Sequence, residues 1–441
     1  MGRCGSEVKG AFLIMTISRF SLSLPLLFLD SSTSPPTMLN MRLSPFRAVQ
    51  RSIPLWKPSP TTQRTLASQC SLPAAYYRGG TSRAVFFQRD HLPAQQSQWA
   101  PIFRRVIGSP DPYGRQLDGL GGGVSSLSKV CVVGPPTRPD ADIDYTFIAL
   151  GVRNDHVDYS SNCGNMISAV GPFAVDAGLV PVSPDPDSRV DLRIHNTNTG
   201  KVVRARFGVI DGEAAAEGDF AIDGVAGTAD PIQLDFLDPA GSRTGRLFPT
   251  GRVTDTFDGV STTCIDVSNP ACFVRAADLG VRGNLTPDEI DAHPTLLPRL
   301  DSIRRQAGVA MGLADRGEDV PGSVPKIGLV SPPLSDDRAA QAGQTPQEVD
   351  VLVRALSVGQ PHKAVPITVA LALAAAAQVP GSVVADVTGG ARVSSTGLTL
   401  GHASGRLAVG AEYGEDGTLR HATVFRTARR LMEGRVFWKG S

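Results

Sequence analysis

Short runs of alternating apolar and polar residues recur along most of this chain, and such runs predict β-strands. Val190, Leu192 and Ile194 alternate toward a polar turn, and the residues from 203 to 207 alternate away from it. This pattern predicts a hairpin whose tip is rich in amides and hydroxyls. Further strands are expected at 74–77, 84–87, 130–133, 144–152, 232–236, 262–267, 325–330 and 424–437.

Two longer stretches are apolar on nearly every side, which is typical of buried helices. One covers 166–179; the other covers 364–378, with Pro366 in its first turn and Pro380-Gly381 after its end. The second stretch is too short to span a membrane. Less apolar helices are expected at 92–107, 287–292 and 298–312, and 347–356 fits either a helix or a strand.

Each buried helix follows a loop and precedes further strands, so the two halves of the chain follow one plan. The expected fold class is α+β, with two similar domains, each a mostly antiparallel sheet or barrel around a central apolar helix. We place the domains at 74–250 and 251–441, with the option that the last strand returns to the first domain. The two helix N-termini would then face each other across an interdomain cleft, where their dipoles favour an anion.

The first 73 residues differ from the rest and are left out of the expected fold. The stretch from 11 to 29 is apolar but is interrupted by Arg19 and Pro25, so it is a poor transmembrane helix. No acidic residue occurs between Ser31 and Arg89, and arginine and serine recur there. This composition is typical of an organelle transit peptide and would predict a mitochondrial protein. A disordered tail without a targeting signal is equally compatible with this composition, and it would predict a cytoplasmic protein.

The balance of charged residues limits the kinds of partner that this chain is expected to bind. The 441 residues carry 43 basic and 42 acidic side chains, a formal net charge of +1, so neither nucleic acid nor an anionic membrane is favoured as a partner.

The six cysteines are scattered and form no close pair. This spacing indicates free thiols and argues against a structural zinc site. We therefore expect no bound metal.

A glycine-rich loop that runs from Gly119 to Lys129 contains the first candidate catalytic residue. The loop lacks the ending of a phosphate-binding Walker motif and the spacing of a dinucleotide fingerprint. Gly122 would let a ligand approach the backbone, and Ser125 and Ser126 would add hydrogen-bond donors. Lys129 enters an apolar strand, where burial would lower its pKa and make it a general base. The alternative is a surface lysine whose apolar stem packs on the protein.

The second candidate catalytic residue is Cys163, at the start of the first buried helix. Free N–H groups and the helix dipole at that end stabilise a thiolate or an anionic substrate. Asn162, Gly164 and Asn165 flank the cysteine and are typical of turns and of ligand-binding loops. An inert buried cysteine is the alternative. We expect Lys129 and Cys163 to face one pocket.

Other loops supply candidate substrate-binding residues. The turn Arg78-Gly79-Gly80-Thr81-Ser82 offers free N–H groups, hydroxyls and a cation to a carboxylate, although a plain hairpin turn explains it too. His362, which follows the segment of uncertain structure, is a further candidate. So are Ser404 and Gly405 near the C-terminus.

Five motifs occur in order along the chain: Arg78-Gly79-Gly80-Thr81-Ser82, Gln116-Leu117-Asp118-Gly119, Ser125-Ser126-Leu127-Ser128-Lys129, Asn162-Cys163-Gly164-Asn165 and Gly401-His402-Ala403-Ser404-Gly405. From about Ala74 to the C-terminus the chain thus resembles the PrpF family. This is the group of 2-methylaconitate cis-trans isomerases, which includes aconitate, methylitaconate and oxalomesaconate isomerases. The resemblance implies a diaminopimelate epimerase-like fold, Lys129 and Cys163 as the catalytic residues, and proton shifts on unsaturated di- or tricarboxylates without metal or redox cofactor.

Other functions stay open. Relatives of this kind with two facing cysteines are racemases or epimerases. Here the segment 268–271, which lies where a second catalytic loop would fall in a duplicated fold, reads Ser-Asn-Pro-Ala, and Cys272 is expected in the core. A non-catalytic accessory protein, functionally linked to an aconitase-like dehydratase, is a second alternative. A hydrolase that pairs Cys163 with His195 or His362 is a third. A homodimer is compatible with each of these alternatives.

Overall fold

The computed structural model describes residues 69–159, 162–183, 185, 188–333, 349–357, 359–389 and 397–440. The expectations for residues 1–68, a transit peptide or a tail, lie outside this part of the chain. The first strand begins at Gln69, before the expected start of the fold at Ala74. No helix in the described part is long and apolar enough to cross a membrane.

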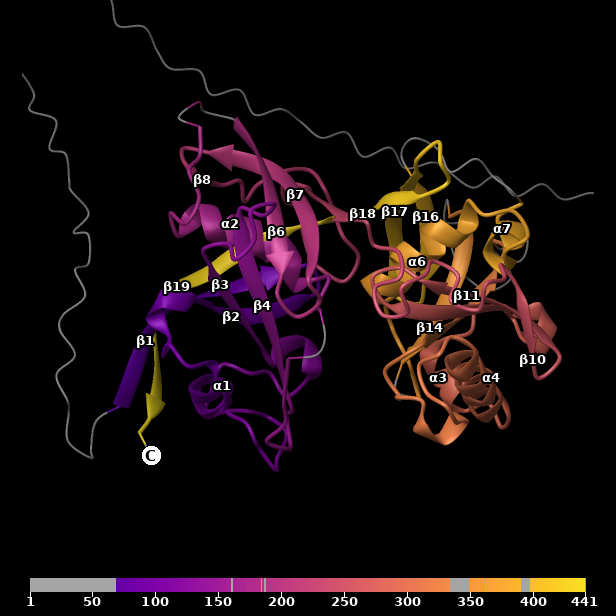
Figure 1. Ribbon diagram of the computed structural model, residues 1–441. Coiled ribbons are helices and arrows are strands. Elements are labelled where there is room, and N and C mark those ends of the chain that lie inside the picture. Colours follow the sequence, from indigo (N-terminus) through magenta and orange to yellow (C-terminus); the bar gives the residue numbers. More distant parts are fainter. Residues whose placement is uncertain are drawn as a thin grey trace, which may run out of the picture. The chain divides into compact units, whose positions relative to one another are not determined.

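Strands dominate the described residues, and helices are few and short (Figure 1). The strands are β1 (Gln69–Gly79), β2 (Ser82–Gln88), β3 (Lys129–Gly134), β4 (Ile143–Leu150), β5 (Val157–Asp158), β6 (Ser188–Asn196), β7 (Lys201–Ile210), β8 (Glu213–Ala214), β9 (Ile232–Leu237), β10 (Asp255–Phe257), β11 (Val260–Asp266), β12 (Pro270–Arg275), β13 (Lys326–Ser331), β14 (Val351–Ser357), β15 (Gln360–Pro361), β16 (Leu398–His402), β17 (Gly405–Tyr413), β18 (Leu419–Arg426) and β19 (Ala428–Lys439). The α-helices are α1 (Trp99–Ile107), α2 (Val170–Asp176), α3 (Pro287–Asp291), α4 (Leu296–Ala310), α6 (Ile367–Ala377) and α7 (Val383–Val387). Short 3-10 helices are η1 (Arg89–His91), η2 (Gln96–Gln98), η3 (Ser125–Leu127), η4 (Met166–Ala169), η5 (Ala277–Leu279) and η6 (Gly317–Asp319).

One pattern of strand pairing occurs twice. In the first half, β1 pairs antiparallel with β2, β2 parallel with β3, β3 antiparallel with β4, and β4 antiparallel with β5 and parallel with β6. In the second half, β11 to β16 pair in the same sequence of directions. A helical segment follows β5, and another follows β15. The chain therefore contains an internal structural repeat.

The repeat defines corresponding positions in the two halves. Lys129 opens β3, and Lys326 opens its counterpart β13. The turn between β11 and β12, which contains Ser268 and Asn269, corresponds to the turn between β1 and β2. The counterpart of the Cys163 loop is therefore 362–366, which reads His-Lys-Ala-Val-Pro and contains no cysteine. Cys272 lies in the core, as expected.

The two predicted buried helices lie in the hydrophobic core. Every residue of α6 except Thr368 is buried, and no residue from Met166 to Val175 is exposed. The first helix differs from the prediction because it begins as η4 and becomes α-helical only at Val170. Pro172 has no N–H to donate and therefore fits the first turn of α2, but not the middle of one continuous α-helix. The uncertain segment near 347–356 is a strand, β14.

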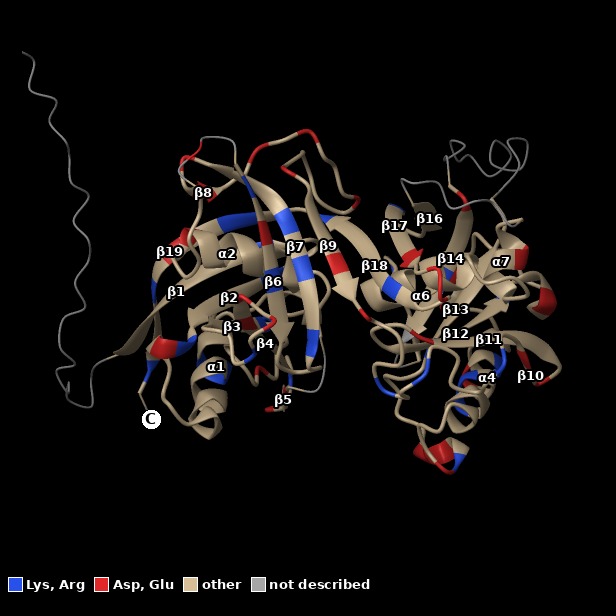
Figure 2. Cartoon of the chain, turned by 45° about the horizontal axis from the view of Figure 1, so that its top comes forward, with Lys and Arg blue, Asp and Glu red and all other residues tan. Residues whose placement is uncertain are grey.

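The last strand belongs to the first half. β19 pairs antiparallel with β1 from Gln69–Lys439 to Gly79–Ala428, beside the β1–β2 hairpin (Figure 1). Strand β18 pairs with both β17 and β9, and so it connects the two halves of the sheet. Basic and acidic residues are interspersed over the elements of both halves (Figure 2), as the balanced net charge suggests.

Candidate active site

Lys129 and Cys163 lie together, although 34 positions separate them in the sequence. The Nζ atom of Lys129 donates a hydrogen bond to Ser82 Oγ at 2.9 Å and lies 3.4 Å from Cys163 Sγ. Parallel pairing of β2 with β3 brings the beginnings of these two strands to one edge, which explains the contact with Ser82. Both Lys129 and Cys163 are half-buried, so a small molecule can reach them.

The Cys163 loop lies between the N-termini of the two buried helices. The carbonyl of Cys163 accepts the backbone N–H of Ile167 at 3.1 Å, which attaches the loop to the first helical turn. A Cβ atom added to Gly164 would lie 2.7 Å from Cβ of Ile367, the first residue of α6. Only glycine allows this approach. The two helix N-termini therefore meet beside the thiol, and their unpaired N–H groups favour negative charge.

Two asparagines fix the loop on either side of the cysteine. Asn162 Oδ1 accepts a hydrogen bond from Asn196 Nδ2 at 2.9 Å, and Asn165 Nδ2 donates to Thr81 Oγ1 at 3.0 Å. Asn196 is buried at the end of β6, where its own Oδ1 accepts the N–H of Asn198 at 3.0 Å. Sequence reasoning did not single out Asn196; the amide-rich hairpin tip was the available signal.

The turn between β1 and β2 packs against the same loop. A Cβ atom on Gly79 would lie 2.6 Å from the backbone oxygen of Asn165, and one on Gly80 would lie 2.3 Å from Asn165 Oδ1. Gly80 also has a φ of +51°. Both glycines are therefore required sterically. Arg78 stabilises the turn, because its guanidinium donates to the carbonyls of Gly80 at 3.1 Å and Thr427 at 2.9 Å.

The glycine-rich loop is held by one buried side chain, Gln116. Its Oε1 accepts the N–H of Gly123 and the hydroxyl of Ser128, each at 2.8 Å. Ser128 directly precedes Lys129, so these bonds position the lysine. Gln116 lies in one of the recognised motifs but was not predicted as a site residue.

Three candidate residues of this loop are more exposed to solvent than Gln116 and Ser128. Gly122 and Ser125 are exposed, and Ser126 is half-buried. Both serines belong to η3, the short helical turn that precedes Lys129. Their contact with substrate stays a prediction.

The candidate residues near the C-terminus are linked to the same region. Ser404 Oγ donates to the carbonyl of Lys363 at 2.9 Å, which ties the β16–β17 turn to the loop before α6. Gly405 packs against Asp223, and a Cβ atom on the adjoining Gly224 would lie 3.3 Å from Thr81 Cγ2. The turn that contains Thr81 and the turn that contains Ser404 are thus connected through one intervening loop.

His402 is a residue of this region that was not predicted. Its Nδ1 accepts the N–H of Ser404 at 3.2 Å. Burial, together with the nearby Arg426 cation, lowers the pKa of His402 to about 4. The imidazole is therefore neutral near pH 7.

The predicted residue His362 has different neighbours. It lies beside Lys326, and burial and that cation lower the pKa of His362. Burial and Arg243 lower the pKa of Lys326 to about 8. Among the contacts of the described residues, His362 is not joined to Lys129 or Cys163. A role of His362 in substrate binding stays a prediction.

The arrangement does not resemble a thiol–histidine pair. In the described part of the chain, the hydrogen-bond partner of Cys163 Sγ is Lys129. His195 is buried, and its Nδ1 lies 2.9 Å from Asp144 Oδ1. The described residues also contain no group of three or more His, Cys, Asp and Glu side chains arranged to hold a metal ion.

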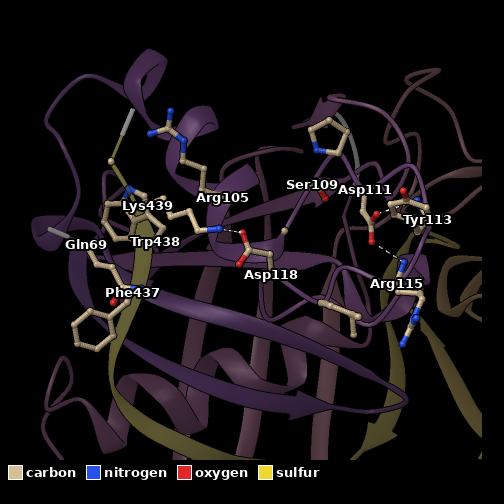
Figure 3. Close-up of a pocket in the computed structure, with 14 residues that line it drawn as sticks. Gln69, Arg105, Ser109, Asp111, Tyr113, Arg115, Asp118, Phe437, Trp438 and Lys439 are labelled. Atoms are coloured by element: carbon tan, nitrogen blue, oxygen red, sulfur yellow. Dashed lines mark hydrogen bonds and ion pairs between the residues drawn. The ribbon is translucent and has the colours of Figure 1, made fainter. Parts of the chain in front are cut away.

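A separate cavity of about 520 Å³ lies outside this cluster (Figure 3). Its walls come from the ends of β1 and β19, the end of α1 and the loop after it, and include Arg105, Tyr113 and Trp438. The ion pair between Lys439 and Asp118, at 2.9 Å, lies in its lining. No predicted site residue lines this cavity.

Comparison with known proteins identifies relatives over almost the whole described region. The family described as PrpF protein matches residues 69–439. The "3-methylitaconate isomerase" of Eubacterium barkeri is 38% identical over 382 residues, 84% of this chain and 98% of the relative. The "2-methyl-aconitate isomerase" of Cupriavidus necator is 38% identical over 392 residues, again 84% and 98%. A crystal structure titled methylitaconate-delta-isomerase is 36% identical, with a TM-score of 0.74 and coverage of 85% of this chain and 98% of that one.

Proposed function

This chain belongs to the PrpF family and is an isomerase, and we propose that it catalyses a 1,3-proton shift or cis-trans isomerisation of a small unsaturated di- or tricarboxylic acid. The acids in the names of the relatives are methylitaconate and 2-methylaconitate. At 38% identity either acid, or aconitate, is a reasonable substrate for this chain.

The observation that carries the proposal is the contact between Lys129 Nζ and Cys163 Sγ at 3.4 Å. An allylic C–H next to a carboxylate is weakly acidic, and a nearby base can remove its proton. Two proton-carrying groups in contact can serve both carbons of a three-carbon allylic unit. We assign Lys129 as the principal base and Cys163 as the partner acid or electrostatic anchor.

Proton removal leaves a dienolate whose charge spreads over the allylic unit and its carboxylate. The converging helix N-termini beside Gly164 stabilise that charge without reorganisation. Return of the proton to the other terminal carbon moves the double bond. Return to the first carbon after rotation changes the geometry of the double bond. The proton that leaves the substrate is held by Lys129 or Cys163 and returns to the substrate, so the reaction needs no other proton donor or acceptor.

The internal repeat supports the fold, the domain boundaries and the substrate position that we propose. Two halves with one pairing pattern, each with a buried helix, fit a diaminopimelate epimerase-like fold with its site between two domains. We place the domains near 74–250 and 251–441, with β1 extended to Gln69 and β19 assigned to the first domain. The substrate would lie at the junction of the β1–β2 turn, the Cys163 loop and the turn at Ser404.

Proton NMR in deuterated water tests the proposal. The purified chain is incubated with cis-aconitate, trans-aconitate, 2-methylaconitate and 3-methylitaconate. We expect one acid to isomerise and to take up deuterium at an allylic carbon. Lys129→Met should lower kcat/KM by about 10³-fold, within the range of general base catalysis.

A lysine outside the site provides the control for that experiment. Lys439 is exposed, and Lys439→Met should keep wild-type activity. Retention of isomerisation by Lys129→Met would refute the assignment of the base. If the wild type binds these acids but never exchanges their protons, the proposed proton shift on these substrates is wrong.

A further inference from the structure

Arg426, at the end of β18, lies beside Gly80 and has no acidic partner in the part of the chain that the structure describes. One terminal nitrogen donates to the neighbouring carbonyl of Phe425 at 3.2 Å. Its Nε is buried and has no hydrogen-bond partner in the described part of the chain. The residue as a whole is half-buried. Burial lowers the pKa of Arg426 to about 10.

The position of Arg426 connects it to the proposed reaction. A Cβ atom on Gly80 would lie 3.3 Å from Cδ of Arg426 and 2.3 Å from Asn165 Oδ1. The arginine stem therefore packs on the same glycine that packs on the Cys163 loop. Asn165 Oδ1 is also buried and has no partner among the described residues. Two unsatisfied polar groups thus lie next to the turn that ends at Ser82, the hydrogen-bond partner of Lys129.

Two other arginines in the vicinity, Arg78 and Arg430, are bonded to protein groups. Arg78 donates to two carbonyls of the β1–β2 region, and Arg430 forms ion pairs, among them one with Glu213 at 2.8 Å. The nearby carboxylate of Asp223 accepts the backbone N–H of Arg406. The neighbouring His402 is neutral near pH 7 and does not supply a counter-charge. Among the described residues, Arg426 therefore differs from Arg78 and Arg430 in that its buried Nε has no hydrogen-bond partner and its one hydrogen bond goes to a neighbouring carbonyl.

An unpaired, partly desolvated guanidinium is unfavourable, and such a group in a native protein calls for a functional explanation. A guanidinium donates two parallel hydrogen bonds to a carboxylate, a geometry that fixes both position and orientation. We propose that Arg426 binds one carboxylate of the unsaturated acid and so orients the allylic unit toward Lys129 and Cys163. This inference rests on the proposed function and names a substrate-binding residue for it.

Binding to an isomerisation-deficient protein tests the proposal separately from turnover. Calorimetry with trans-aconitate and 3-methylitaconate is carried out in the Lys129→Met background, with and without Arg426→Gln. We expect Arg426→Gln to weaken binding at least 30-fold. Arg426→Lys, which keeps the charge but loses the paired donors, should recover part of the affinity.

The matched control is Arg420→Gln on the same strand. Arg420 is exposed and pairs with Asp416 at 2.8 Å, so this change should leave affinity within twofold. The melting temperature of the ligand-free Arg426→Gln protein should not fall. Among the described residues, the carbonyl of Phe425 is the one group that would lose a hydrogen bond to the guanidinium. A merely structural role would lower the melting temperature and leave the affinity of the folded protein unchanged.

Substrate analogues identify the carboxylate. Monoamides of the acid, in which one carboxylate is a carboxamide, are compared in proteins with and without Arg426. The amide at the bound position should weaken binding strongly when Arg426 is present and hardly at all in Arg426→Gln. Equal affinity of all acids for the two proteins would overturn the inference even if isomerisation is found. Arg426-dependent binding without isomerisation would overturn the proposed function alone.

Discussion

His402 is a single side chain whose surroundings determine its charge. It lies among Asp223, Arg426 and Arg354, and burial is the largest effect that lowers its pKa, from 6.5 to about 4. Between these values the unfolded chain binds a proton that the folded protein does not. Folding stability should therefore fall as the pH falls from about 6.5 to about 4, by at most ~3 kcal/mol.

Urea unfolding at several pH values between 4 and 7 measures this effect. In His402→Asn the amide oxygen can still accept the N–H of Ser404, but no group titrates there. The free energy of unfolding of this variant should depend less on pH than that of the wild type. Parallel curves for the two proteins would contradict the assignment of the pH effect to His402.

Local sequence was sufficient to suggest some candidate site residues and not others. Lys129 and Cys163 are flanked by glycines, serines and asparagines, whose backbone preferences indicate a ligand-binding loop without any knowledge of distant contacts. Arg426 gave no such signal, because an arginine at the end of a strand is ordinary. Its importance depends on Gly80, which lies nearly 350 positions earlier in the chain, and such proximity follows only from the assembled sheet.

At the scale of secondary-structure elements, Gly164 allows the loop before η4 to pack against the first residue of α6. Gly164→Ala would place a Cβ atom 2.7 Å from Ile367 Cβ and 2.8 Å from its Cγ2, closer than atoms can pack. The two helix N-termini must then separate. We expect a loss of stability of about 1–3 kcal/mol, as for other overpacked sites, and a fall in kcat/KM of about 10-fold or more.

Thermal unfolding and steady-state kinetics of the purified variant measure both effects. Gly317→Ala is the matched control, since its added Cβ atom would lie 3.7 Å from the nearest neighbour, Arg305 Cβ. That control should behave as the wild type. A Gly164→Ala protein with unchanged melting temperature and activity would show that the helix ends are not in contact in solution.

Helices and hairpins were easier to predict than the way they combine. The apolar run at 364–378 and the less apolar segment 298–312 indicated helices, and α6 and α4 lie there. The pairing order could not be derived, because a hydrophobic strand pattern does not specify its partner. The turn at Ser268 is an example: its place in the chain suggested a counterpart of the cysteine loop, whereas strand pairing matches it to the turn at Gly80.

At the scale of the whole molecule, β19 completes a half of the protein that begins more than 340 residues earlier. Removal of residues 428–441 would leave the full length of β1 without this partner and would remove Arg430, which pairs with Glu213. The free energy of unfolding of a native protein is only about 5–15 kcal/mol, so the loss of a whole strand pairing is expected to unfold this half. We expect the shortened chain to be insoluble or to lose its first half to limited proteolysis.

Removal of residues 440–441 alone is the control, because β19 ends at Lys439. This shorter deletion should keep the wild-type melting temperature and protease resistance. If the longer deletion also keeps both, then β1 and β19 do not stabilise each other.

Because β1 pairs with β19, one edge of β1 stays unpaired until nearly the whole chain has been synthesised. Ser71 and Arg435, which share hydrogen bonds, are 364 positions apart. Ribosomes add about 5–20 residues each second, so the nascent chain exposes the open edge of β1 for roughly 20 to 70 s before its partner emerges. An open strand edge invites pairing with other chains. Shielding of that edge during translation should therefore favour correct folding, and slow translation of the second half should lower the yield of soluble protein.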